Sequence, residues 1–197
     1  MSTALSRLEL GAAGTPAAPC TGVRPITDEE FGLFQTLIRA EAGINLTEPK
    51  RALLVGRLTR RLRELGLDDF GAYYRRVTVE DPAERVTMFD LVSTNETHFF
   101  REPKHFEFLT DRLFPKWKAD AAAGARTKRI RVWSAACSTG EEPYTLAMLL
   151  LDYFPPSSGW SVEILGTDIS TRVLARASAA VWPNDRAAEI PTPYLKR

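Results

Sequence analysis

Residues 130–151 most constrain the fold, because they pass without interruption from a β-strand pattern through a loop into a helix pattern. The first part contains the β-branched and aromatic residues that buried strands favour, Trp133 among them. The loop that follows consists of small residues as far as Gly140, and Pro143 then suits the first turn of a helix. This order predicts an α/β fold in which a ligand approaches the backbone at the helix N-terminus. An ordinary strand–helix turn that binds nothing also fits the pattern.

The composition of this loop limits the ligands that it could accept. It has one glycine instead of the three of a dinucleotide-binding fingerprint, and it ends in the carboxylates Glu141 and Glu142. A pyrophosphate would be repelled there by like charge. A ligand that carries hydroxyls, an amine or a sulfonium group would not be.

A second strand is predicted at residues 162–168, with Asp168 at its carboxyl end. In doubly wound folds an acidic residue at this place binds ribose hydroxyls, although the separation from Gly140 is somewhat longer than the usual value of about 20 residues. Asp168 could instead cap the helix that begins near Ser170 and Thr171. One carboxylate could also serve both roles.

The pattern along the chain divides it into four regions. Residues 1–24 are rich in alanine, glycine, threonine and proline, and they predict a disordered tail. Residues 25–92 predict a small helical domain. Residues 93–102 predict a polar linker, and residues 103–197 predict the α/β part.

Capping signals place the helices. Thr27 and Glu30 form a capping-box pattern, Gly43 ends the first helix, and Asp68 is expected to cap a short one. Longer helices are predicted over Pro82–Val92 and over residues 103–122. From these helices the side chains expected to point inward are Val86, Phe89, Leu91, Phe106, Phe108 and Leu109.

The predicted helix over residues 50–65 has the clearest charge pattern. Its apolar face consists of Leu54, Val55, Leu58, Leu62 and Leu65. Its other face carries Arg57, Arg60, Arg61 and Arg63. Between Lys50 and Arg63 there are six basic residues and no acidic one. Such a run fits a solvated face, but a face of one sign also suits an acidic partner.

Composition argues against several function classes. With a net charge of +1, the chain has no global basicity that would argue for nucleic acid as a partner. Two cysteines and two histidines make a structural zinc site unexpected, and we expect no metal. No apolar run is long enough to span a membrane, and no signal-peptide pattern is present, so a cytoplasmic location is expected.

Three motifs together resemble one enzyme family. They are the loop Ser134–Tyr144 (SAACSTGEEPY), the upstream run Asn95–Glu102 (NETHFFRE) and the downstream Gly166–Ile169 (GTDI). In sequence and order they are similar to the CheR family. Its members are methyltransferases dependent on S-adenosylmethionine, and they esterify glutamates on the cytoplasmic helical region of bacterial chemotaxis receptors. The resemblance extends from about residue 26 to the end of the chain.

The resemblance implies roles for particular residues. Asn95, Thr97 and Arg101 match cofactor-contacting positions, and a guanidinium such as that of Arg101 suits the methionyl carboxylate of S-adenosylmethionine. Glu142 and Asp168 would hold the ribose hydroxyls and adjoining groups. The resemblance also implies that Arg57, Arg60 and Arg63 dock on the receptor. Because an attacking glutamate is already ionised at neutral pH, we expect no catalytic base, and we expect a monomer.

The chain departs from the family pattern after Ala180, where no further strand–helix unit is predicted. We therefore expect a small N-terminal all-α domain followed by an incomplete Rossmann-like methyltransferase domain, corresponding to about the N-terminal two-thirds of such an enzyme. A loosely packed sheet edge and weak cofactor binding are expected to follow. The alternative is a truncated, non-catalytic module that binds receptor or cofactor.

Overall fold

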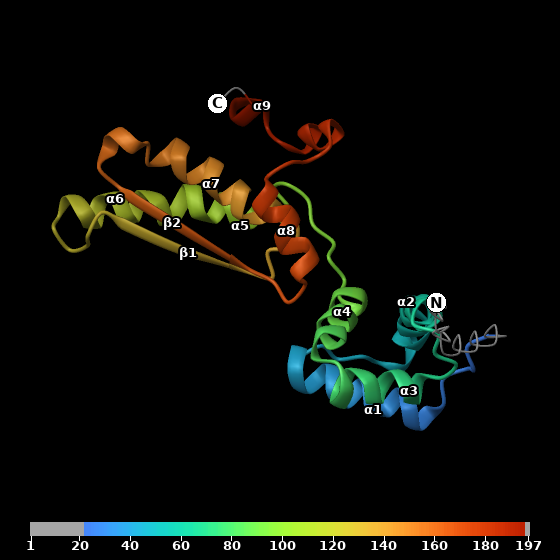
Figure 1. Cartoon of the computed structure of the whole chain (residues 1–197). Helices are drawn as coiled ribbons and strands as arrows, with labels where there is room; N and C mark the ends of the chain where they lie inside the picture. The colour runs from blue at the N-terminus through green and yellow to red at the C-terminus, as the bar shows by residue number, and fades with distance from the viewer. Residues whose placement is uncertain (1–21, 196–197) are drawn as a thin grey trace, which may run out of the picture.

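The computed structural model describes residues 22–195 of the 197-residue chain. The chain forms a helical part over residues 28–92 and an α/β part over residues 103–195, joined by an extended connection (Figure 1). A small all-α unit therefore precedes an incomplete parallel α/β unit, which confirms the predicted fold class. The predicted disordered tail lies outside the described residues except for its last three.

The helical part packs four α-helices around one core. They are α1 (Asp28–Ala42), α2 (Arg51–Glu64), α3 (Phe70–Arg75) and α4 (Pro82–Val92). The short 3-10 turn η1 (Glu48–Lys50) precedes α2, and the π-helical turn η2 (Arg76–Glu80) extends α3. The core includes Leu54, Leu58 and Leu62 from α2, so the predicted apolar face of that helix is confirmed. Fully buried aromatic side chains complete it: Phe31, Phe34, Phe70 and Tyr73.

The boundaries of α1 agree with the predicted capping signals. The Thr27 hydroxyl accepts a hydrogen bond from the Glu30 N–H at 3.2 Å, and the Glu30 carboxylate accepts one from the Thr27 N–H at 2.8 Å. Gly43 ends the helix with a left-handed φ of 66°. Local sequence signals therefore suffice to place this helix.

Two predicted positions in the helical part are wrong. The residue that caps α3 is Asp69, whose carboxylate accepts from the Ala72 N–H at 2.7 Å, whereas the Asp68 carbonyl accepts from the Arg24 N–H. On α4, Val86 is exposed and Glu84 is buried instead. Burial of Glu84 is tolerated because its carboxylate is fully paired, as described below.

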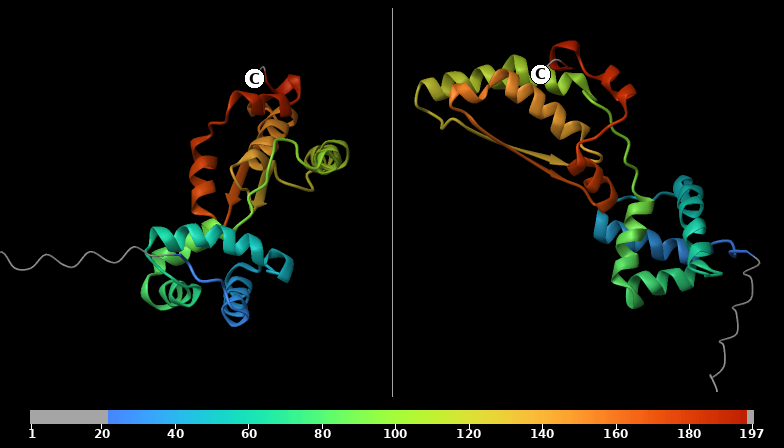
Figure 2. Two further views of the ribbon diagram at one scale, coloured as in Figure 1. Left: turned by 90° about the vertical axis from the view of Figure 1, so that its right-hand side faces the viewer. Right: turned by 45° about the horizontal axis from the view of Figure 1, so that its top comes forward.

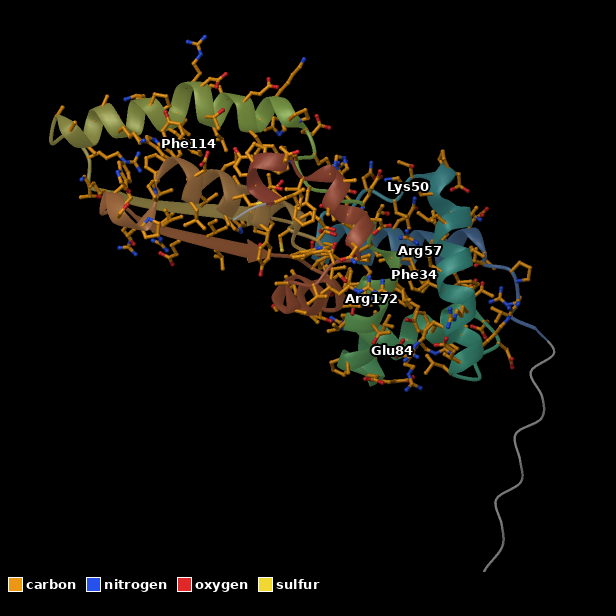
Figure 3. All side chains as sticks on the ribbon, turned by 90° about the horizontal axis from the view of Figure 1, so that it is seen from above. Phe34, Lys50, Arg57, Glu84, Phe114 and Arg172 are labelled. Carbon is orange, nitrogen blue, oxygen red and sulfur yellow. The ribbon has the colours of Figure 1, made fainter. Side chains whose placement is uncertain are left out.

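The α/β part begins with a single helical run that starts where predicted. It comprises α5 (Pro103–Phe108), the π-helical turn η3 (Leu109–Leu113) and α6 (Phe114–Ala122). Phe106 and Phe114 are buried, and Figure 3 shows Phe114 between this run and the helix after the first strand. The prediction for Phe108 is wrong, since its ring is exposed. Phe108 lies two positions after Phe106, about 200° around the helix, and so faces solvent.

The sheet has two parallel strands, β1 (Arg129–Ala135) and β2 (Ser161–Thr167), which pair from Arg129↔Ser161 to Ala135↔Thr167. They are connected by α7 (Glu141–Tyr153) and the 3-10 turn η4 (Pro156–Ser158), and α8 (Thr171–Ala179) follows β2. The connection satisfies the rule that parallel strands need a crossover, usually a helix.

Within residues 22–195, helices cover only one face of this sheet. Figures 1 and 2 show α5, α6 and α7 on the same side of the strands, where Ile130 and Phe114 belong to one core cluster. On the other face Trp133 is 68% exposed and Leu165 is 58% exposed. The expectation that Trp133 lies in a buried strand is therefore wrong. Side chains alternate along a strand, and within residues 22–195 nothing covers the face on which Trp133 lies.

The chain after α8 folds back over the segment that connects the two parts. It contains the 3-10 turn η5 (Asn184–Glu189) and the short helix α9 (Thr192–Leu195), and the described residues include no third strand. The Trp182 ring contacts those of Phe99 and Tyr144, at centroid distances of 5.2 and 5.0 Å. Among the helices described, none is long and apolar enough to cross a bilayer.

Candidate functional site

The candidate site lies where β1 and β2 end side by side, because Ala135 is paired with Thr167. Two adjoining cavities open there, of about 580 Å³ and 280 Å³. The larger is lined by Asn95, Arg101 and Asp168, and the smaller by Thr97, Arg101 and Glu142. All five residues predicted to contact the cofactor therefore line this pair of cavities. A ligand at the carboxyl ends of parallel strands is the general expectation for α/β folds.

The loop from Ala136 to Gly140 has an unusual backbone. Ala136, Ser138 and Gly140 all have positive φ, of 61°, 49° and 99°. A Cβ atom on Gly140 would lie 3.0 Å from the Cβ of Ala177 on α8, so only glycine fits the close contact between loop and helix. The small residues of the sequence motif therefore allow the loop to turn tightly against α8.

The connecting segment Asn95–Glu102 has a similarly constrained backbone. Phe100 and Glu102 have positive φ, of 55° and 59°. The segment is tied to the loop, since the Ser138 hydroxyl donates to the Asn95 carbonyl at 3.0 Å. Four of the five described non-glycine residues with positive φ therefore belong to the two segments that face each other here. Such conformations cost free energy and are concentrated at functional sites.

Asp168 connects the loop to α8. One carboxylate oxygen accepts from the Ser138 N–H at 2.8 Å, and the other accepts from the Ser170 N–H at 2.9 Å. The N-cap of α8 is Ser170, whose side chain accepts from the Val173 N–H. Each carboxylate oxygen has a further lone pair, so Asp168 can still accept hydroxyl groups from a ligand in the larger cavity.

The two neighbouring glutamates have different surroundings. Glu142 is exposed at the smaller cavity, where its carboxylate accepts from the Ser134 hydroxyl at 2.6 Å. Glu141 is buried, accepts from the Thr139 hydroxyl and forms an ion pair of 2.8 Å with Arg186. Of the two, Glu142 is therefore the one that lines this pair of cavities.

Arg101 has unused donors. Its guanidinium donates to the Glu96 carbonyl at 3.2 Å, and within residues 22–195 no carboxylate forms an ion pair with it. The side chain is exposed and lines both cavities. A guanidinium with free N–H groups can bind a carboxylate in bidentate fashion.

Arg186 is a residue of this region that sequence reasoning missed. It lies in η5, after the last predicted helix, and its guanidinium reaches both Glu141 and the Thr97 carbonyl. No local signal could have found it, because it is one basic residue in a stretch with neither periodicity nor motif. Only the folded chain shows that it lies beside residues more than forty positions away.

Cys137 packs inside the loop. Its sulfur lies 3.0 Å from where a Cβ on Gly166 would be, so the thiol occupies the space that this glycine leaves. Burial raises the pKa of the thiol, and the nearby Asp168 carboxylate raises it further. A thiol that stays protonated in a packed position is a poor nucleophile.

The residues predicted to dock on a receptor differ from one another. Arg57 is half-buried and donates to the carbonyls of Val92 and Ser93 at 2.6 and 3.0 Å, which satisfies the C-terminus of α4. Arg60 is exposed and forms an ion pair of 3.0 Å with Glu64. Arg63 is exposed, and none of the ion pairs in the described part of the chain includes it. Arg60 and Arg63 are therefore exposed on α2, whereas Arg57 has a structural role at the end of α4.

The helical part contributes directly to the site. Ala42 and Ile44, at the end of α1, line the larger cavity. Asp90 on α4 accepts from the Thr171 hydroxyl of α8 at 2.9 Å. Burial would raise the pKa of Asp90, but hydrogen bonds from Ser170, Thr171 and the Arg172 backbone outweigh it and lower that pKa. The helical part therefore contacts α8 through the Asp90 carboxylate and separately contributes residues to the wall of the larger cavity.

The arrangement suits S-adenosylmethionine. A volume of about 580 Å³ is within the usual range of small-molecule sites, about 300–1,000 Å³. Arg101 offers donors for a carboxylate, Asp168 and Glu142 offer acceptors for hydroxyls, and these carboxylates do not repel a positively charged sulfonium. In the described residues no group of three His, Cys, Asp or Glu side chains is placed to hold a metal ion.

Fold and site together define a parallel α/β protein with a ligand-sized cavity at the carboxyl ends of its strands, preceded by an all-α domain. Comparison with protein families gives the same class: the CheR methyltransferase SAM-binding domain matches residues 95–197, and the CheR methyltransferase all-alpha domain matches residues 29–93. The chain belongs to the CheR methyltransferase family, and the cofactor of its second domain is S-adenosylmethionine.

Curated relatives share most of this chain. It is 38% identical over 173 residues to the chemotaxis protein methyltransferase of Borreliella burgdorferi, covering 87% of this chain and 60% of that protein. It is 37% identical over 174 residues to the chemotaxis protein methyltransferase of Escherichia coli, covering 87% and 57%. The Salmonella typhimurium protein of the same name is 39% identical over 169 residues, covering 85% and 54%. The chain thus spans less than two thirds of the length of these relatives.

Proposed function

We propose that this chain forms the cofactor-binding and partner-docking part of an enzyme that methylates chemotaxis receptors. The reaction transfers a methyl group from S-adenosylmethionine to glutamate side chains and yields glutamate methyl esters and S-adenosylhomocysteine. One observation carries the proposal. Side chains from three separate motifs line the same pair of cavities at the carboxyl ends of β1 and β2.

We assign roles by chemistry. Arg101 binds the methionyl carboxylate, because its guanidinium has free donors at the junction of the two cavities. Asp168 and Glu142 accept hydrogen bonds from the ribose hydroxyls and adjoining groups. Asn95 and Thr97 form the part of the cavity wall that the connecting segment contributes.

The protein's task in this reaction is positioning. S-Adenosylmethionine supplies an electrophilic methyl group on a sulfonium sulfur. The attacking glutamate carboxylate has an ordinary pKa of about 4.3 and is already ionised at neutral pH, so no general base is required. The oxygen–methyl bond forms as the sulfur–methyl bond breaks. The side chains around the cavities orient the donor and exclude water from the carboxylate.

The partner that we propose is the cytoplasmic helical region of a chemotaxis receptor, which places the reaction in the cytoplasm. Arg60 and Arg63 present positive charge from α2, and the receptor helices carry the acidic residues to be methylated. We propose a monomer that approaches the receptor with this face.

A second candidate function is a binding module without catalytic activity. The bare sheet face favours it, because a two-stranded sheet with exposed Trp133 and Leu165 forms only part of an ordinary α/β layer. The two functions differ in turnover: both predict cofactor or receptor binding, and only the first predicts methyl transfer.

The first test is isothermal titration of the 197-residue chain with S-adenosylhomocysteine. We expect weak but measurable binding that falls about tenfold or more on Asp168→Ala, because a charged hydrogen-bond acceptor is lost. Glu107→Ala, which removes an exposed carboxylate of α5, is the control and should leave the affinity unchanged.

The possible outcomes of this titration distinguish the two candidate functions. Binding that depends on Asp168 supports the cofactor site, and a methyl-transfer assay on receptor fragments then decides between the enzyme and the module. Binding that is unaffected by Asp168→Ala would contradict the assigned site. No binding at millimolar ligand would contradict the cofactor role of this chain.

A further inference from the structure

The segment after α8 is attached to the connecting segment by a polar network around Arg186. The Arg186 guanidinium donates to the Thr97 carbonyl at 2.8 Å and forms ion pairs with Glu141 at 2.8 Å and Glu189 at 2.9 Å. The Glu189 carboxylate in turn accepts from the Phe99 N–H at 2.9 Å. One guanidinium therefore joins the N-terminus of α7, the connecting segment and η5.

The connecting segment needs this support. Asn95 and Thr97 line the proposed cofactor cavities on one side and a cavity of about 650 Å³ on the other. Phe99 and Phe100 anchor one end of this segment by packing, whereas around Asn95 and Thr97, where cavities lie on both sides, hydrogen bonds contribute to fixing its position. Within the same segment, Phe100 and Glu102 have strained positive φ values, which persist only where the surroundings hold them.

We propose that Arg186 is a positioning residue for the cofactor site. It holds Thr97, and with it the segment that ends in Arg101, at a fixed distance from the loop of residues 136–140. This inference rests on the proposed function, in which Arg101 binds the methionyl carboxylate. It adds that the affinity for the amino-acid end of the cofactor depends on a residue that touches no part of the cofactor.

Burial makes the Arg186 contact strong. The Glu141 side chain is 3% exposed and that of Arg186 is 29% exposed. Removal of the guanidinium would leave a buried carboxylate without its counter-ion, and the Thr97 carbonyl would lose its donor. Both changes free the connecting segment to shift relative to the loop.

The test compares two ligands that differ only at the amino-acid end. S-Adenosylhomocysteine and 5′-methylthioadenosine share the adenosine and the thioether, but only the first has the carboxylate and amine that Arg101 would meet. We expect Arg186→Gln to lower the affinity for S-adenosylhomocysteine about tenfold and the affinity for 5′-methylthioadenosine less than about threefold, both measured by isothermal titration. If Arg186 served only the overall stability of the protein, the substitution would lower the affinities for both ligands equally.

The chain offers a closely matched control. Arg61 and Glu84 in the helical part form a similar ion pair of 2.6 Å, with side chains 27% and 4% exposed. Arg61→Gln therefore removes an equally buried guanidinium at a distance from the cavities, and it should leave the ratio of the two affinities unchanged. Thermal unfolding of both variants by circular dichroism shows whether their losses of stability are comparable.

A second variant keeps the test decisive if Arg186→Gln does not fold. Arg186→Lys retains the charge beside Glu141, but an ammonium lacks the planar fork that reaches Thr97 and Glu189 together. We expect the Arg186→Lys variant to fold and still to lose affinity for S-adenosylhomocysteine more than for 5′-methylthioadenosine. An equal loss of affinity for both ligands, or no loss of affinity in either folded variant, would overturn the positioning role. A wild-type chain that binds neither ligand would instead overturn the proposed function.

Discussion

Glu141 and Glu142 show how neighbouring residues of one type acquire different roles. Pairing with Arg186 keeps the Glu141 carboxylate inside the protein, whereas Glu142 reaches the smaller cavity. The same holds on α2, where Arg57 binds the carbonyls at the end of α4 while Arg63 faces solvent. A sequence pattern gives the face of a helix, but the partner of each side chain is decided by segments that are distant in the chain.

This difference among the arginines predicts different outcomes for their substitution. The double change Arg60→Glu and Arg63→Glu should weaken binding to a receptor helical fragment tenfold or more, and the loss should shrink at high salt because exposed charges are screened. Arg57→Gln should instead lower the free energy of unfolding by about 1–2 kcal/mol through the lost carbonyl contacts. Receptor binding measured at low and high salt checks the first prediction, and urea unfolding of Arg57→Gln checks the second. Receptor binding that is unchanged by the double substitution would remove the docking role.

At the scale of elements, the reliable predictions are those that depend on local signals. The capping box of α1, the apolar face of α2 and the bounds of α4 follow from residues within a few positions of each other. The errors at Trp133 and Phe108 concern burial. Burial depends on whether another element covers a face, and neither strand propensity nor helical spacing contains that information.

The contact between α2 and α4 predicts a pH dependence. Burial would raise the pKa of Glu84, but hydrogen bonds from Arg61 and Tyr73 outweigh it and hold that pKa below the ordinary value for a glutamate. A carboxylate with a lowered folded pKa stabilises the protein above its unfolded pKa and loses this contribution as the pH falls through the folded value. Urea unfolding followed by helical circular dichroism should therefore show stability falling below about pH 4.5, less steeply in Glu84→Gln than in the wild type. Equal slopes in the two proteins would contradict the assignment to Glu84.

At the scale of the molecule, the candidate site is assembled from parts that are far apart in sequence. Motif resemblance could predict that Asn95, Thr97, Arg101, Glu142 and Asp168 belong to one site, and the structure places them around adjoining cavities. It could not predict the contribution of Ile44 to the larger cavity or the contact of Arg186 with Thr97. Those contacts arise when the helical part and the last described segment pack against the connecting segment.

The uneven covering of the sheet predicts uneven local stability. In the helical part, α1 and α2 bury Phe34, Ile38 and Leu58 completely, so their amides exchange only when the whole unit opens. In the part of the chain that the structure describes, both strands of the α/β part have an unpaired edge and one bare face, so they should open more readily. Hydrogen exchange of the 197-residue chain should therefore show faster exchange in Ser161–Thr167 than in Arg51–Glu64. Saturating S-adenosylhomocysteine should slow exchange at the ends of the strands, near Ala135 and Thr167, more than at their starts. Strong protection along both strands without ligand would contradict the expected loose packing.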